Sequence, residues 1–190
     1  MDRIPRPERY GPLEQAFHWV TAMLVLVAFL YGPGGSEQQV YSASRDLDRQ
    51  LHETLGLTVF VLTALRLAWR SFDVRPEGPP VAAWMGLGAK VVQALLYLLL
   101  FALPITAVTG AWLEGHPLTL LAGVKLGPFL PESHRPGTAI ARVHAWLGDA
   151  IMWLAGLHAL AALYHHFVLK DRVLRSMLPV TGSTGRPGRS

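Results

Sequence analysis

Four long apolar stretches separated by polar segments dominate the pattern of the chain. They cover about residues 13–31, 51–69, 90–113 and 143–169. Each approaches the roughly 20 residues that a helix needs to cross the hydrocarbon core of a membrane. The first stretch carries His18 and Trp19 and lacks a small-residue cleavage site, which argues against a cleaved signal peptide. We therefore predict an all-α integral membrane protein, built as a four-helix bundle.

The remaining segments complete the predicted organisation. We expect an N-terminal arm over residues 1–12, one transmembrane domain over residues 13–179, and a disordered tail over residues 180–190, which are mostly polar and rich in glycine. The apolar segment 118–130 is too short to span a membrane and is interrupted by glycine and proline. It is expected to lie at the membrane interface.

Composition supports a bilayer as the solvent of this chain. Its residues are 51% hydrophobic and 16% charged, whereas a soluble domain has about 25% charged residues. The absence of cysteine excludes disulfides, iron–sulfur clusters and covalent c-type haem. A net charge of +4 would suggest an acidic partner for a soluble protein. Here the charges flank the spans, so we expect membrane lipid and no nucleic acid as a partner.

The distribution of Lys and Arg predicts the orientation. With four spans, twelve of these residues fall on the side of the two termini and five on the opposite side. Because the cytoplasmic side of a membrane protein collects positive charge, both termini are predicted to be cytoplasmic.

Four of the eight histidines lie within or at the start of a span: His18, His52, His144 and His158. His144 and His158 are 14 residues apart, about 21 Å along a helix and about 40° short of four full turns. They therefore project from nearly one face, close to opposite membrane surfaces. The predicted topology places His18 at the inner depth of His158 and His52 at the outer depth of His144.

Two opposed imidazoles at each of two depths are the arrangement that bis-histidine haem ligation needs. The sequence thus predicts two haem b groups, with His18 and His158 on the inner iron and His52 and His144 on the outer iron. Filled axial positions favour electron transfer over oxygen activation. The alternative for each histidine is a hydrogen bond between helices.

Three further residues are candidates for the haem sites. Gly56 and Gly148 each follow a histidine by four residues and leave room for a flat porphyrin, or serve ordinary helix packing. Arg66 lies 14 residues after His52 and either pairs with a haem propionate or extends to the membrane surface as a positive anchor.

Several strings in these helices carry a family resemblance. They are Phe17-His18-Trp19, Leu51-His52-Glu53-Thr54-Leu55-Gly56, Ala102-Leu103-Pro104-Ile105-Thr106, Val143-His144 with Leu147-Gly148, and Gly156-Leu157-His158 followed by His165-His166. From about residue 12 to 179 the chain resembles the bacterial cytochrome b-561 family of four-helix di-haem membrane cytochromes, which includes a membrane-bound superoxide oxidase.

The resemblance implies the same ligand pairs and a bacterial inner (plasma) membrane location. It also implies electron exchange with membrane quinone, with His165 near the quinone, and a small outside donor such as superoxide. The alternative for His165 is a polar cap at the interface. Apolar helix faces would suit a homodimer as well as lipid.

Two other functions compete with this oxidoreductase. The first is a haem-bearing membrane anchor that relays electrons for a partner dehydrogenase, hydrogenase or soluble cytochrome. The second is a transporter that binds zinc or another divalent metal through paired histidines. Such metal sites usually add carboxylate or thiolate ligands, and the spans hold no cysteine and few acidic residues away from their ends. The transporter is therefore the least favoured.

Overall fold

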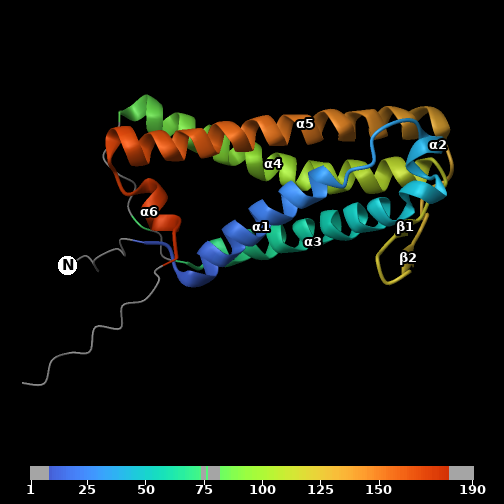
Figure 1. Cartoon of the computed structure of the whole chain (residues 1–190), viewed down its shortest axis with the longest axis horizontal. Coiled ribbons are helices and arrows are strands. Elements are labelled where there is room, and N and C mark those ends of the chain that lie inside the picture. Colours follow the sequence, from blue (N-terminus) through green and yellow to red (C-terminus); the bar gives the residue numbers. More distant parts are fainter. Residues whose placement is uncertain (1–8, 74–75, 77–81, 180–190) are drawn as a thin grey trace, which may run out of the picture.

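The computed structural model describes residues 9–73, 76 and 82–179 of the 190 residues, and within them four long helices form an antiparallel bundle (Figure 1). The four helices are α1 (Pro12–Leu30), α3 (Asp46–Arg70), α4 (Ala83–Leu113) and α5 (His134–Tyr164). Each is long and apolar enough to cross a membrane. The predicted all-α membrane fold is confirmed. The disordered tail predicted over residues 180–190 and most of the predicted arm lie outside the described residues.

Three of the helices begin earlier than their apolar stretches do. α3 starts at Asp46, α4 at Ala83 and α5 at His134, whereas the spans were predicted from residues 51, 90 and 143. Hydropathy marks only the part of a helix that lies in hydrocarbon, so the polar first turns of α3 and α5 escape it. Asp46 and Asp48 also favour a helix start, because negative charge stabilises the N-terminal end of the helix dipole.

The bundle consists of two helix pairs. α1 packs against α3, and α4 packs against α5, while α3 also contacts α4. Small residues allow the second pair to approach closely: a Cβ on Gly110 would lie 3.2 Å from the backbone nitrogen of Ala141. Such contacts between small residues are typical of membrane helices.

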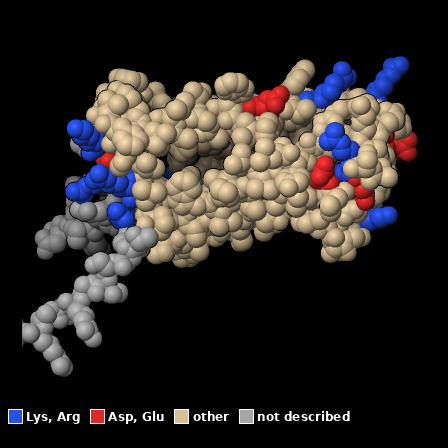
Figure 2. All heavy atoms as spheres, viewed as in Figure 1, with Lys and Arg blue, Asp and Glu red and all other residues tan. Residues whose placement is uncertain are grey.

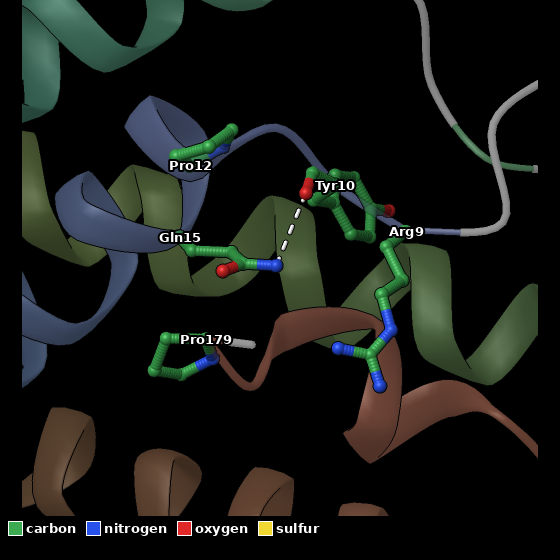
Figure 3. Close-up of a pocket in the computed structure, with 5 residues that line it drawn as sticks. All are labelled: Arg9, Tyr10, Pro12, Gln15 and Pro179. Carbon is green, nitrogen blue, oxygen red and sulfur yellow. Dashed lines mark hydrogen bonds between the residues drawn. The ribbon is translucent and has the colours of Figure 1, made fainter. Parts of the chain in front are cut away.

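The end of the bundle where the chain begins is closed by α6 (Val173–Met177) and is here called the terminal end. After α5 a short π-helix (η2, His165–Leu169) leads to Lys170, whose left-handed conformation reverses the chain. The indole Nε1–H of Trp19 donates to the carbonyl of Met177 at 2.8 Å. The amide of Gln15 donates to the carbonyls of Tyr10 at 3.0 Å and Ser176 at 3.1 Å, and Figure 3 shows the first of these bonds. These bonds hold α6 against α1.

The opposite end, here called the hairpin end, carries α2 (Glu37–Val40), the 3-10 turn η1 (Ala43–Arg45) and a small hairpin of β1 (Leu118–Thr119) and β2 (Lys125–Leu126). A Glu53 carboxylate oxygen accepts the backbone N–H of Thr119, and the indole of Trp112 donates to Leu126 at 3.1 Å. The segment predicted to lie at the interface is thus a hairpin tied to α3 and α4. Two-residue strands carry too little periodicity to be predicted from sequence.

Charged side chains gather at the two ends of the bundle and leave a broad uncharged belt between them (Figure 2). An acidic side chain over the middle of α5 interrupts this belt in the view of Figure 2. The orientation of the two ends relative to the cytoplasm stays a prediction.

Candidate functional site

The structure brings the four membrane histidines together as two opposed pairs. The ring centroids of His18 on α1 and His158 on α5 are 6.3 Å apart. Those of His52 on α3 and His144 on α5 are 5.9 Å apart. The first pair lies toward the terminal end and the second toward the hairpin end. The pairing in space is the one that the depth argument predicts, and both pairs link α5 to the α1–α3 pair.

At the hairpin end, His52 is oriented by the last turn of α1. Its Nδ1–H donates to the carbonyl of Ala28 at 2.7 Å. The last four carbonyls of a helix have no partner of their own within the helix. The carbonyl of Ala28 is one of these, because α1 ends at Leu30. Gly32 leaves space for the ring, since a Cβ there would lie 3.4 Å from His52.

His144 is oriented in the same way from α4. Its Nδ1–H donates to the carbonyl of Leu103 at 2.9 Å, and the Thr106 hydroxyl lies 3.4 Å from the same nitrogen. Leu103 precedes Pro104, a proline inside the helix. The third span, which contains no histidine, therefore supplies the acceptor that orients one histidine.

At the terminal end, a buried ion pair lies beside His18. The guanidinium of Arg66 donates from Nε at 3.1 Å and from Nη2 at 3.0 Å to the carboxylate Oε1 of Glu14. Its Nη1 lies 3.5 Å from Nδ1 of His18. Arg66 is 9% exposed and Glu14 3%. The structure thus gives Arg66 an interior ion-pair partner within the protein, and a position facing the His18 ring, instead of a path to the membrane surface.

The hairpin-end pair fits an iron ion held by two imidazoles. Because the Nδ1 atoms of His52 and His144 donate to backbone carbonyls, each Nε2 atom carries a lone pair free for a metal. A metal ion about 2 Å from each ligating nitrogen would place the two ring centroids about 6 Å apart, and both measured separations agree with this value. The histidine pairs therefore have the spacing that bis-histidine haem ligation requires.

The two candidate glycines face open space. A Cβ on Gly56 or Gly148 would meet no atom within 4 Å. Gly110, in contrast, packs directly against α5. Close helix packing therefore accounts for Gly110 and not for Gly56 or Gly148, and a role of these two glycines beside a haem stays a prediction.

His165 lies two turns beyond His158, at the start of the π-helix. Its Nδ1 lies 2.5 Å from a carboxylate oxygen of Asp171, whose other oxygen accepts the backbone N–H of Val173 at 2.9 Å. His165 is thus part of the turn that leads into α6, and its Nε2 atom is not used in this bond.

Two cavities lie at different depths of the bundle. One of about 340 Å³ is lined by Phe29 of α1 and by Asp149, Met152 and Trp153 of α5. The other, of about 300 Å³, lies at the terminal end and is lined by the residues labelled in Figure 3: Arg9, Tyr10, Pro12, Gln15 and Pro179.

A divalent-metal site finds no support in the described part of the chain. No group of three or more histidine, aspartate, glutamate or cysteine side chains there could hold a metal ion.

The chain is similar to known membrane cytochromes along nearly its whole length. The family model described as prokaryotic cytochrome b561 matches residues 9–180. The chain belongs to this family. It is 29% identical over 178 residues to cytochrome b561 homolog 2 of Escherichia coli strain K12, covering 93% of this chain and 95% of that protein. It is 33% identical over 180 residues to cytochrome b562 of Cereibacter sphaeroides, covering 89% of this chain and 94% of that protein.

A third relative has a name that states an activity. The probable superoxide oxidase CybB of Yersinia pestis is 28% identical over 181 residues, covering 90% of this chain and 97% of that protein. As a member of the prokaryotic cytochrome b561 family, the chain is a multi-pass membrane protein of electron transfer that binds haem b. The predicted family is confirmed.

Sequence reasoning missed the residues that orient the histidines in this cytochrome. Ala28 and Leu103 act through backbone carbonyls, which carry no residue-type signal. Glu14 is an acidic residue at the start of a span and Pro104 is a proline within one, but residue type alone does not say what either contacts. Only the structure shows what these residues contact.

Proposed function

We propose that the chain binds two haem b groups, through His18 with His158 and through His52 with His144, and transfers electrons between membrane quinone and a small outside donor. The two opposed imidazole pairs at two depths carry this proposal. When bound, haem b supplies a one-electron redox centre. The two histidines of each pair would hold it, an arrangement that favours electron transfer over the binding of oxygen.

Superoxide is the donor that we propose. Oxidation of two superoxide anions releases two oxygen molecules and two electrons, which together with two protons reduce one quinone to quinol. The name of the Yersinia pestis relative supports this choice. Cations at the hairpin end would attract the anion, and they are Arg45, Lys125, Arg135 and Arg142. Arg49, a fifth cation expected there, is buried and pairs with Asp46 and Glu53.

Quinone is proposed to exchange electrons at the terminal end, near His165. A histidine bound to a carboxylate is a suitable proton carrier, because the carboxylate fixes the orientation of its ring. His165 and Asp171 form such a pair. We place the terminal end on the cytoplasmic side of a bacterial inner membrane, following the excess of Lys and Arg there.

The experiment uses the haem-loaded protein alone, in vesicles that contain quinone. Superoxide generated outside is expected to reduce the quinone, and His52→Ala is expected to abolish the reaction. His134→Ala is the matched control: His134 is exposed and pairs only with Glu132 among the described residues, so its variant should react as the unaltered protein does.

If the haem-loaded protein reduces no quinone unless another protein is added, the proposed function as an oxidoreductase in its own right is refuted. It would instead favour the alternative function, a haem-bearing anchor for a partner dehydrogenase, hydrogenase or soluble cytochrome.

A further inference from the structure

The outer ring nitrogen of the histidines, Nδ1, faces different chemistry at the two ends of the bundle. At the hairpin end, the Nδ1–H groups of His52 and His144 donate to backbone carbonyls at 2.7 and 2.9 Å. At the terminal end, Nδ1 of His18 lies 3.5 Å from Nη1 of Arg66. A guanidinium has only donors and keeps its charge. His18 thus faces a cation where the two rings at the hairpin end face an acceptor.

Arg66 is held in this position from two other helices. Its Nε and Nη2 atoms donate to one carboxylate oxygen of Glu14 on α1, at 3.1 and 3.0 Å. The ring centroid of Tyr97 on α4 lies 5.9 Å from its Cζ atom, and Arg70 contacts the same ring at 5.7 Å. Because Glu14 uses Nε and Nη2, Nη1 is left for the side that faces His18. The positive end of the ion pair is therefore the end beside the histidine.

Burial makes this charge effective. The side chain of Arg66 is 11% exposed and that of Glu14 4%, so salt and water screen the pair less than they screen charges at the surface. The second carboxylate oxygen of Glu14 is buried without a hydrogen-bond partner among the described residues. Replacing a buried ion pair as a whole by apolar side chains is often neutral for stability. Stability alone therefore does not explain a cation beside His18.

The two kinds of partner affect a ligated iron in opposite directions. A carbonyl that accepts the Nδ1–H makes the imidazole a more basic ligand, which favours the oxidised iron. A cation beside the ring favours the state with one more electron, because it attracts the added negative charge. Hydrogen bonds to the ligands and burial are among the means by which a protein sets the reduction potential of a haem. The His18–His158 pair should therefore give its haem the higher potential.

We propose that Arg66 is a positioning residue that acts through His18 and raises the reduction potential of the terminal-end haem above that of the hairpin-end haem. The inference rests on the proposed ligation of two haem b groups by the histidine pairs. An electron that enters at the hairpin end then moves to the terminal end with a favourable free energy. Arg66 thus gives electron transfer along the bundle its direction.

The test is a redox titration of the haem-loaded protein, followed by optical spectra, in a His52→Ala background that retains the His18–His158 haem. Glu14→Gln with Arg66→Gln removes both charges. At a fixed solution potential, the ratio of reduced to oxidised haem should then fall at least about threefold. Arg66→Lys keeps the charge and should retain most of the ratio. Glu14→Gln alone leaves the cation without its counter-charge, so the ratio should rise.

The His18→Ala background provides the matched control, because it retains the haem at the hairpin end. That haem should be reduced at a lower potential than the one retained in His52→Ala. The same changes at Glu14 and Arg66 should alter its ratio by less than about twofold, since they lie roughly 20 Å away along the bundle.

Each other result has a definite meaning. An unchanged ratio in the double variant, the reverse order of the two potentials, or equal falls in Arg66→Lys and the double variant would overturn the inference and leave the proposed function intact. If the double variant carries no haem, a rise of the ratio in Glu14→Gln supports the inference and a fall overturns it. Absence of haem from both backgrounds would count against the proposed function as well.

Discussion

The Nδ1–H of His52 donates to the carbonyl of Ala28, 2.7 Å away on the neighbouring helix. This bond fixes the ring through a backbone group that the end of α1 leaves unsatisfied. His144 is fixed in the same way by Leu103. Both bonds use Nδ1 and leave Nε2 free, so each imidazole is prepared for a metal before a cofactor arrives.

The glycines next to the histidines should matter for haem and not for helix packing. Gly148→Leu fills space that no atom of the protein occupies within 4 Å of a Cβ. We expect haem at the hairpin end to be lost or much weakened while the helices still assemble. The haem-to-protein ratio and the circular dichroism of the purified variant measure the two effects.

Gly110→Leu provides the matched comparison. A Cβ there would press against Ala141 of α5, so this variant should lose helix assembly itself. If both variants lost haem equally and still assembled, Gly148 and Gly110 would not differ in role as haem contact and helix contact.

The ion pair of Arg66 with Glu14 should contribute strongly to stability. Arg66→Met leaves a buried carboxylate without its partner, and such changes cost about 3–5 kcal/mol. We expect a large loss of resistance to unfolding by denaturing detergent.

The double variant Glu14→Gln with Arg66→Met should recover part of this loss, because no unpaired charge is left. If the double variant loses more stability than the sum of the losses of the two single variants, the broken ion pair is not the cause of the loss in Arg66→Met.

Gln15 should hold α6 in place. Gln15→Leu removes two hydrogen bonds to backbone carbonyls, and within the described residues only the Ser176 carbonyl keeps another donor, the N–H of Tyr10 at 3.2 Å. Leaving an acceptor unsatisfied costs about 1–3 kcal/mol. We expect faster hydrogen exchange in residues 173–177, with little change in the hairpin β1–β2. Unchanged exchange in α6 would mean that the bonds from Trp19 and from the backbone of Tyr10 secure α6 without Gln15.

Stability at the hairpin end should depend on pH through Glu114. Burial raises the pKa of this carboxyl group above its ordinary value of 4.5. The folded state therefore binds the proton more tightly than the unfolded state, and this group makes stability fall as the pH rises from 4.5 through the raised pKa. Glu114→Gln should remove that fall, as measured by detergent unfolding from pH 4 to pH 8. If the stability of Glu114→Gln fell more steeply with rising pH than that of the unaltered protein, the predicted direction of the pH dependence would be wrong.

The fold and the histidine pairs followed from sequence because both rest on periodicity. Apolar stretches of membrane length fix the four spans, and the 14-residue spacing of His144 and His158 fixes two depths on one face. What sequence could not supply depends on contacts between helices. The carbonyls of Ala28 and Leu103 have no signal in residue type, and Arg66 could not be assigned to Glu14 before the α1–α3 packing was known.

The haem content of the purified protein tests the central claim most directly. The ratio of haem to protein, with optical spectra of the oxidised and dithionite-reduced forms, should show two low-spin haems in each chain. His18→Ala and His52→Ala should each carry one, and His134→Ala should carry two. A protein expressed with ample haem that is colourless, or that keeps two haems without His18 or His52, would contradict the assignment of these histidine pairs as haem ligands.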